Sequence, residues 1–583
     1  MLSSIIILTY NKLDYTKECI ESIRNYTDQG TYEIIVVDNA SNDGTQEWIQ
    51  SQDDIFDICN ESNLGFPKGC NQGIDVANGN NIVLLNNDVV VTPGWLDILL
   101  NALYSSEDNG AVGPVTNSAS NYQTVPVAYQ SKNEMLAFAT KYNRPDNTKW
   151  EQRLRLIGFC MVIKREVVDK VGLLDEMFSP GNYEDDDYSC RINQSGYKLI
   201  LCKDVFIHHY GSISFGEANE AYTKLLEKNK CKFEEKWNFK SEDLSNIRRE
   251  LSSLIEQPKE GQIIRVLEVN CGCGGTLLEI KNKIKNVELF GLEANEFAAA
   301  FACEIAEVRI AGVEEALNYP ENYFDYIILS NTFEKLRDPW GFLRKLKMQL
   351  KQNGKILASI YNVMHFSAIR SMLNGQWSYT DNGLLAHSHI RFFSLYEIDK
   401  MFTKAGFEHM EYQSIMLPIS DRDQSYIENL SKLGNHPVEQ YKTYQYVVKA
   451  LNNNEKDMLQ KIILRLENEN YPKKLLTEFV NLITINNITY VDIINEIENS
   501  MIINKQTMYN TLGTALYKAD LFEHVFPLFY ASYELNKLNK ETLYNIGFLL
   551  YKAGDNNLSL HYLRQIEDYD PETAELIKLI QPC

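Results

Sequence analysis

The sequence lacks several features that would assign it to a special class of protein. No apolar run approaches the roughly 18 residues that a membrane-spanning helix needs, and the candidates Ile5–Leu8 and Ile82–Leu85 end within the length of a strand. The first residues carry neither a basic region nor a cleavage site, so we expect no signal peptide. With 44% hydrophobic and 23% charged residues over 583 positions, the composition is that of globular domains. The length predicts about four domains at roughly 150 residues each.

Basic residues are outnumbered, and this weighs against two classes of partner. The chain has 57 Lys+Arg and 79 Asp+Glu, which gives a formal charge of −22, and it has no basic stripe. Binding to a nucleic-acid backbone or to an anionic lipid surface needs clustered Lys and Arg, so we expect neither as a partner. The 11 cysteines are scattered without a paired CxxC spacing, which predicts a reduced, cytoplasmic chain.

Three regions of different pattern follow one another along the chain. Residues 1–240 alternate β-branched runs, such as SIIILTYN and YEIIVVDNAS, with helical stretches, which is the βαβ rhythm of a largely parallel sheet. Residues 241–262 are polar and predict a linker. The rhythm restarts with IIRVLEVNCGCGG and continues through residues 263–418. We therefore predict an α/β multidomain fold with two Rossmann-like domains.

The last region, residues 419–583, shows almost no strand signal, only amphipathic helices, and part of it repeats. The run GTALYKA beginning at Gly513 recurs as GFLLYKA at Gly547, which is 34 residues later. A helix–turn–helix unit of this length resembles tetratricopeptide repeats, here over about residues 507–574, and implies a surface that binds peptides. A helical cap without a ligand explains two copies equally well.

Polar residues end the predicted strands of the first region, where open parallel sheets bind ligands. Thr9-Tyr10-Asn11 ends the first strand, Asp38 the second, and Asn86-Asn87-Asp88 the strand IVLL. Asp88 suits a hard cation, which prefers carboxylate and water oxygens. Taken singly, these residues also have structural explanations. An Asx turn or helix cap explains Asp38, and favourable charge in a first helical turn explains the acidic run Glu184–Asp187.

The order of these motifs resembles the inverting glycosyltransferases of family 2, which have the GT-A fold. The matching stretches include SIIILTYN, EIIVVDNASNDGT, NLGFPKGCNQGI, IVLLNNDVVV, NYEDDDYSC and HHYGSIS. The resemblance implies that Asp185 is the general base and that Asp88 and His209 hold Mn²⁺ or Mg²⁺. It also implies a site for a UDP-sugar or dTDP-sugar donor formed by Thr9, Tyr10, Asn11, Asp38, Asn63, Gly65, Lys68, Asn87, Glu184 and Arg191. The metal motif Asn86-Asn87-Asp88 has one acid where family members often have two, which predicts weaker metal affinity.

The second α/β region carries a glycine loop after its first strand. This loop, with FDYIILSN and NGKILASIYN further on, resembles class I S-adenosylmethionine-dependent methyltransferases. The resemblance implies that S-adenosylmethionine contacts Glu268, Gly272, Gly274 and Glu293. Asn270 stands where the family loop usually opens with Gly, and no catalytic base is obvious, although His387 and His389 are candidates. Active methyl transfer and a decayed domain kept for structure both remain open.

The three-part layout resembles bacterial enzymes that glycosylate flagellin and other surface structures. It implies an inverting, metal-dependent transfer of a sugar from a nucleotide-sugar donor to a hydroxyl, which we expect to be Ser or Thr of a protein such as flagellin. One alternative is a transferase that extends a surface glycan with rhamnose or N-acetylglucosamine, with or without sugar O-methylation by the second domain. Another is a non-catalytic scaffold of a glycosylation complex.

Overall fold

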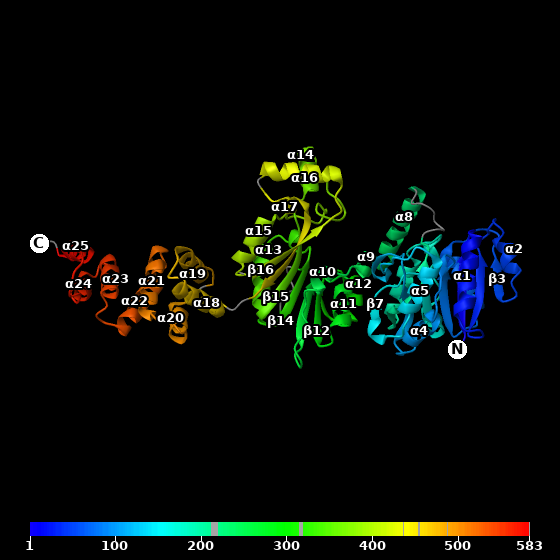
Figure 1. Cartoon of the computed structure of the whole chain (residues 1–583), viewed down its shortest axis with the longest axis horizontal. Coiled ribbons are helices and arrows are strands. Elements are labelled where there is room, and N and C mark those ends of the chain that lie inside the picture. The colour runs from blue at the N-terminus through cyan, green and yellow to red at the C-terminus, as the bar shows by residue number, and fades with distance from the viewer. Residues whose placement is uncertain are drawn as a thin grey trace. The chain divides into compact units, whose positions relative to one another are not determined.

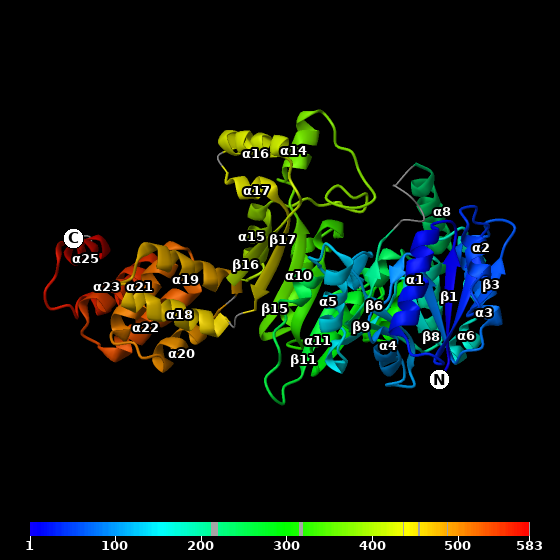
Figure 2. The same ribbon diagram turned by 45° about the vertical axis from the view of Figure 1, so that its right-hand side comes forward.

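A computed structural model describes residues 1–211, 220–313, 319–407, 409–434, 436–452, 455–486 and 488–581. It divides into two compact units, Met1–Asn318 with Tyr326–Thr332, and Tyr319–Asp325 with Phe333–Cys583. The chain runs from blue to red in Figures 1 and 2. The helices of the described part include none that is long and apolar enough to cross a membrane. The ten described cysteines are free thiols.

The first unit begins with an eight-stranded sheet in the order β3-β2-β1-β4-β8-β6-β9-β7. Its strands are β1 (Ser3–Thr9), β2 (Tyr32–Asp38), β3 (Ile55–Cys59), β4 (Asn81–Asn86), β6 (Asn109–Val115), β7 (Trp150–Arg153), β8 (Cys160–Lys164) and β9 (Lys198–Phe206). β1 lies parallel to β2 and β4, with Thr9 opposite Asp38 and Leu8 opposite Asn86. The ends of these three strands therefore meet at one edge of the sheet.

Helices cover both faces of this sheet (Figure 1). They are α1 (Leu13–Tyr26), α2 (Thr45–Gln50), α3 (Phe66–Val76), α4 (Trp95–Leu103), α5 (Lys132–Tyr142), α6 (Arg165–Val171), α7 (Glu184–Gln194) and α8 (Glu220–Trp237). Alternate residues of β1 belong to two separate cores: Ile5 and Ile7 to one, Ile6 to the other. Since both faces are buried, the strands read as continuous apolar runs, and each buried Ile or Val contributes about 1.5–3 kcal/mol.

A second, parallel set of strands follows in the same unit. It contains α9 (Glu242–Ser245), α10 (Arg249–Ser252), β11 (Ile264–Val269), α11 (Gly275–Lys283), β12 (Val287–Glu293), α12 (Glu296–Cys303), β13 (Glu307–Ile310) and β14 (Phe324–Ser330). β11 pairs with β12 and β14, and β12 pairs with β13. The segment expected as a linker, residues 241–262, is packed in place, because Leu244 and Leu251 are buried.

The second unit starts with an antiparallel group in which β17 lies between β15 and β16. Its elements are α13 (Pro339–Gln349), β15 (Leu350–Tyr361), α14 (Phe366–Leu373), α15 (Leu395–Lys404), β16 (His409–Met416), α16 (Asp421–Gly434), α17 (Val438–Lys442) and β17 (Thr443–Leu451). Figure 2 shows α14, α16 and α17 lying together, and they pack through Phe366, Ile427 and Tyr441.

The strand β17 corrects the expectation that residues 419–583 are helical throughout. Tyr446, Val447 and Val448 are buried in its middle because β17 has a partner strand on each side. Its sequence, TYQYVVKAL, is rich in aromatic and β-branched residues that favour strands. The strand is short and follows helical segments, so the sequence analysis did not predict it.

The remaining elements of this unit are helices (Figure 1): α18 (Glu455–Asn468), α19 (Lys473–Asn486), α20 (Tyr490–Asn499), α21 (Lys505–Lys518), α22 (Phe522–Leu535), α23 (Lys540–Lys552), α24 (Asn556–Leu563) and α25 (Pro571–Ile580). The two predicted repeat glycines occupy equivalent positions, each against the following helix. A Cβ on Gly513 would lie 2.5 Å from Phe529, and one on Gly547 would lie 2.6 Å from Leu563. Each glycine therefore lets one helix of a pair approach the next.

Candidate functional site

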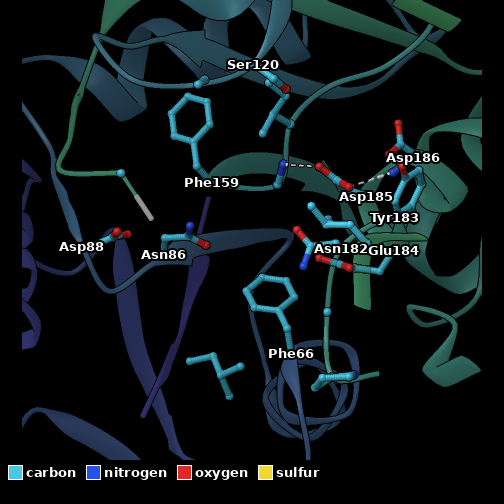
Figure 3. Close-up of a pocket in the computed structure, with 18 of the residues that line it drawn as sticks. Phe66, Asn86, Asp88, Ser120, Phe159, Asn182, Tyr183, Glu184, Asp185 and Asp186 are labelled. Atoms are coloured by element: carbon cyan, nitrogen blue, oxygen red, sulfur yellow. Dashed lines mark hydrogen bonds between the residues drawn. The ribbon is translucent and has the colours of Figure 1, made fainter. Parts of the chain in front are cut away.

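The ends of β1 and β4 and the start of α7 open into a pocket of about 750 Å³ (Figure 3). In the close-up, Asp88 lies on one side of the pocket, while Glu184, Asp185 and Asp186 lie on the other. The predicted site residues that line it are Thr9, Tyr10, Asn63, Gly65, Asn87, Asp88, Glu184, Asp185 and His209. The predicted residues outside its lining, all of them in the described part of the chain, are Asn11, Asp38, Lys68 and Arg191.

Asp38 is fully buried and organises the turn after β2. Its Oδ2 accepts hydrogen bonds from the backbone N–H of Ser41 and from the side chain of Gln46, both at 2.8 Å. Asn11 also supports this turn, since its Oδ1 accepts from the N–H of Asn42 at 2.9 Å. These contacts agree with the Asx-turn explanation of Asp38, whose Oδ1 is buried without a hydrogen-bond partner among the described residues. The lining residue of this loop is the neighbouring Asn39.

Arg191 and Lys68 do not reach the pocket. The Arg191 guanidinium donates to Asp187 Oδ2 at 2.8 Å and to the carbonyl of Leu173 at 2.8 Å, so it fastens α7 to the preceding loop. Lys68 is exposed on α3. Gly65, just before α3, does line the pocket, and it must be Gly: its φ is +85°, and a Cβ would lie 2.7 Å from Pro180.

Asp88 and His209 are brought together by a short antiparallel pair, β5 (Val89–Val90) and β10 (His208–His209). His209 Nε2 lies 3.2 Å from Asp88 Oδ1, and its Nδ1 lies 2.6 Å from the carbonyl of Ser118. The ring stacks on Phe159, with 5.3 Å between centroids. Burial alone lowers the pKa of His209, but the interaction with Asp88 outweighs it and raises that pKa above its ordinary value.

This pair fits a divalent cation in its chemistry. His209 Nε2 is buried and, apart from its contact with Asp88, has no hydrogen-bond partner among the described residues. Carboxylate oxygen and imidazole nitrogen are both ligands for Mn²⁺, and carboxylate oxygen is one for Mg²⁺. Among the described residues, no group of three or more carboxylates, thiols or imidazoles forms. The remaining ligands would come from water and from the diphosphate of a donor.

Asp185 lies at the first turn of α7 with its carboxylate fixed by backbone donors. Oδ2 accepts from the N–H of Gly158 at 2.9 Å and Oδ1 from the N–H of Asp186 at 3.0 Å, as the dashed lines in Figure 3 show. Each oxygen keeps a second lone-pair direction. A fixed carboxylate that lines a pocket has the chemistry of a proton acceptor.

The sequence analysis missed Arg155, which also lines the pocket. Its Nε lies 2.5 Å from Asp186 Oδ1. Burial, opposed by Arg155 and reinforced by Asp185, raises the pKa of Asp186 to about 7. Burial and the Asp185 charge raise the pKa of Glu184 well above its ordinary value. The available signal was an arginine inside the otherwise apolar run LRLIGFC.

The glycine loop of the second domain has three residues with positive φ. Gly272 and Gly274 have φ values of +54° and +85°, and Asn270 has φ +58°. Asn tolerates this left-handed region better than most side chains, which explains how it replaces the usual Gly. Glu293 accepts from the N–H of Gly272 at 2.8 Å and from the N–H of Asn295 at 2.9 Å.

Two further carboxyl groups lie around this loop. Glu268 is buried, its Oε2 has no hydrogen-bond partner in the described part of the chain, and burial raises its pKa to about 8. A Cβ on Gly272 would lie 3.7 Å from Asp243 Cβ. Burial and the charge of Glu293 raise the pKa of Asp243 to about 6. Glu268, Gly272 and Glu293 therefore lie close together around the loop.

The two histidines named as possible bases have unlike surroundings. His389 is buried, with Nδ1 3.0 Å from the carbonyl of Leu384, so it packs the fold. His387 is exposed and lies 4.0 Å from Asp381. Neither arrangement is that of a base held towards a substrate.

Two protein-family models match the chain. Residues 4–172 match the model described as glycosyl transferase family 2, and residues 237–412 match the model described as methyltransferase domain. These matches confirm both predicted domains. The last residues of the motif HHYGSIS, 212–214, lie outside the described residues.

Individual proteins resemble each domain. An uncharacterized glycosyltransferase of Methanocaldococcus jannaschii is 33% identical over 129 residues, which cover 19% of this chain and 44% of that protein. The uncharacterized methyltransferase YcgJ of Bacillus subtilis is 30% identical over 162 residues, 27% of this chain and 61% of that protein. A further relative is matched over only 25% of its own length, so this chain spans less than half of its first curated relatives. The mannosyltransferase PcManGT of Pyrobaculum calidifontis, solved with GDP-Man and Mn²⁺, is 20% identical with a TM-score of 0.28, over 36% of this chain and 56% of that one.

Proposed function

Residues 4–172 form a family 2 glycosyltransferase domain, and on that premise we propose that this chain transfers a sugar, with inversion, from a nucleotide-sugar donor to a hydroxyl acceptor. One observation carries the proposal: Asp88 and His209 face the same pocket as Asp185. A candidate metal pair and a candidate base therefore share one cavity large enough for a small ligand.

The proposed reaction is a single displacement. Asp185 accepts the proton of the acceptor hydroxyl as that oxygen attacks the anomeric carbon. The bond from the anomeric carbon to the diphosphate breaks on the opposite face, and the nucleoside diphosphate leaves with the electron pair. Asp88 and His209 would hold the divalent cation, which offsets charge on the departing diphosphate. The N–H groups of Gly158 and Asp186 keep the Asp185 carboxylate oriented throughout.

For the acceptor, we propose Ser or Thr of a protein such as flagellin. The helical region with its two similar pairs, α21–α22 and α23–α24, supports a protein acceptor, since stacked helix pairs offer an extended surface. Extension of a surface glycan by rhamnose or N-acetylglucosamine is the second candidate, because the pocket lining is polar enough for a sugar acceptor. The shared pocket of Asp88, His209 and Asp185 weighs against a scaffold without activity.

A screen of nucleotide sugars by thermal shift with Mn²⁺ tests the proposal, because a ligand that binds the native state raises its melting temperature. UDP-sugars and dTDP-sugars are the first candidates, and each hit is followed by assay of donor hydrolysis and of transfer to Ser/Thr peptides and to nitrophenyl glycosides. We expect at least one donor that both stabilises the chain and is turned over. Turnover of no donor would contradict the proposed function.

A further inference from the structure

Four consecutive acids begin α7, and the structure compensates them in different ways. Asp187 is fully buried between Arg191 at 2.8 Å and Lys236 at 2.6 Å, outside the pocket lining. Asp186 is buried against Arg155 at 2.5 Å. Asp185 has no ion pair within 4.0 Å among the described residues and is held by backbone N–H groups instead. Glu184, likewise without an ion pair there, is buried beside it.

Arg155 is the one Lys or Arg among the described residues that line the pocket. Its side chain is 17% exposed, enough to face the cavity but not to move freely in solvent. The backbone around it is fixed on both sides: its carbonyl accepts from the hydroxyl of Tyr122 at 2.5 Å, and the N–H of Leu156 donates to Ser189 at 3.2 Å. The backbone of Arg155 is therefore fixed next to the start of α7, where its guanidinium lies against Asp186.

We infer that Arg155 is the positioning residue of the proposed general base: it pairs with Asp186 directly beside the base and places the one positive charge of the pocket lining next to the acids that begin α7. The inference rests on the proposed function. Arg155 acts through Asp186 and Asp185 and does not itself hold the donor.

The surroundings of Arg155 support this role. Asp186, Asp185, Tyr122 and Tyr183 act on the guanidinium, and the two carboxylates raise the pKa of Arg155 against the effect of burial. Glu242 of α9 and Asp187 add negative charge at Asp186, and Glu184 lies next to Asp185. Without Arg155, this cluster of acids would face the pocket with no compensating cation in its lining.

Loss of a cation beside a carboxylate raises that carboxylate's pKa, because the ionised form loses a favourable interaction. Activity that needs the ionised carboxylates at the start of α7 then appears only at higher pH. For Arg155→Gln we expect the acid limb of kcat to move up by about one pH unit, the scale of an opposite charge nearby. We expect KM for the donor to stay within twofold. Arg155→Lys keeps the charge but loses the planar guanidinium, so the acid limb of its kcat profile should lie between those of the wild type and Arg155→Gln.

The matched control is Arg191→Gln, which breaks the neighbouring arginine–carboxylate pair on the same helix, away from the pocket. It should lower the melting temperature without moving the acid limb. The experiment records kcat and KM for donor turnover against pH for the wild type and the three variants, with a melting curve for each. If Arg155→Gln does not fold, Arg155→Lys carries the test alone.

The inference is supported if the acid limb of kcat moves to higher pH in the Arg155 variants while donor KM stays unchanged, and if Arg191→Gln shows no such shift. An unmoved limb would overturn it, and so would a tenfold rise in donor KM without a shift, which would make Arg155 a diphosphate ligand. A wild type that turns over no nucleotide sugar overturns the proposed function and the inference together. An active wild type with an unmoved limb overturns only the inference.

Discussion

In the glycosyltransferase pocket, Glu184 Oε2 is buried without a hydrogen-bond partner among the described residues, and Asp185 keeps free lone pairs. At the glycine loop of the second domain, both oxygens of Glu293 already accept backbone N–H groups. Both regions place carboxyl groups at the ends of parallel strands. The first region opens its carboxyl groups onto a cavity of about 750 Å³, while in the second region the acid expected to hold a ribose also fastens its own loop.

The difference shows that a sequence motif can be present without the arrangement of side chains that a binding site needs. The loop has the glycines of its motif on a left-handed backbone, yet Asp243 adds a second acid beside Glu293. The pocket has one acid in its metal motif, yet strand pairing adds His209 to it. The following experiments challenge this comparison, beginning with the largest expected effect.

Removal of the candidate metal ligands should affect turnover most. We expect Asp88→Asn and His209→Gln each to lower donor turnover about a hundredfold, the scale of losing electrostatic stabilisation of developing charge. Chelation should inactivate the wild type, and Mn²⁺ should restore it. Asp57→Asn, an exposed acid of the same sheet, is the control. Full activity of Asp88→Asn in the presence of chelator would show that turnover needs no metal ion at this site.

The two α/β domains also meet through a buried ion pair, and breaking it should cost stability. Arg153 of β7 lies 2.6 Å from Glu279 of α11, and both side chains are at most 2% exposed. We expect Glu279→Gln to lower the free energy of unfolding by about 3 kcal/mol, because it leaves a buried charge short of a partner. The exposed pair Arg265–Glu288 is the control, and Glu288→Gln should cost less than about 1 kcal/mol. Equal losses of unfolding free energy for Glu279→Gln and Glu288→Gln in denaturant titrations would contradict a larger stabilising effect of the buried pair.

The raised pKa of Glu268 makes a pH-dependent prediction for the loop region. The folded chain holds this proton up to about pH 8, whereas the unfolded chain loses it near the ordinary value of 4.5. Stability should therefore fall as pH rises from about 4.5 to 8. Glu268→Gln, which stays neutral, should raise the melting temperature relative to wild type more at pH 8.5 than at pH 5. The same difference at both pH values would mean that Glu268 does not titrate there.

The smallest effect concerns S-adenosylhomocysteine at the glycine loop. Because the carboxyl group of Asp243 adds negative charge beside Glu293, where a ribose would bind, we expect this ligand to raise the melting temperature less than the best nucleotide sugar with Mn²⁺ does at equal concentration. Glu293→Ala should abolish the shift. A rise in melting temperature as large as that caused by the nucleotide sugar would contradict this expectation, because the loop would then bind the cofactor product as well as the pocket binds its donor.

The sequence predicted what depends on strand pattern and chain order. Asp88 and Asp185 share a pocket because each follows or precedes a regular element whose place the βαβ rhythm sets. It did not predict what depends on distant contacts. Arg155 reaches Asp186 only in the folded sheet, and β17 needs partner strands on both sides. Such choices are settled by packing rather than by local residue preference.

The most direct measurement is donor affinity and turnover of Asp185→Asn, compared with Asp169→Asn, an exposed acid of α6, as control. The variant keeps the shape of the side chain but cannot accept the acceptor's proton. We predict that it binds the nucleotide sugar nearly as well as the wild type and turns it over at least about a hundredfold more slowly, the scale of a lost general base. Turnover at the wild-type rate would contradict the account, because Asp185 would then not be the base.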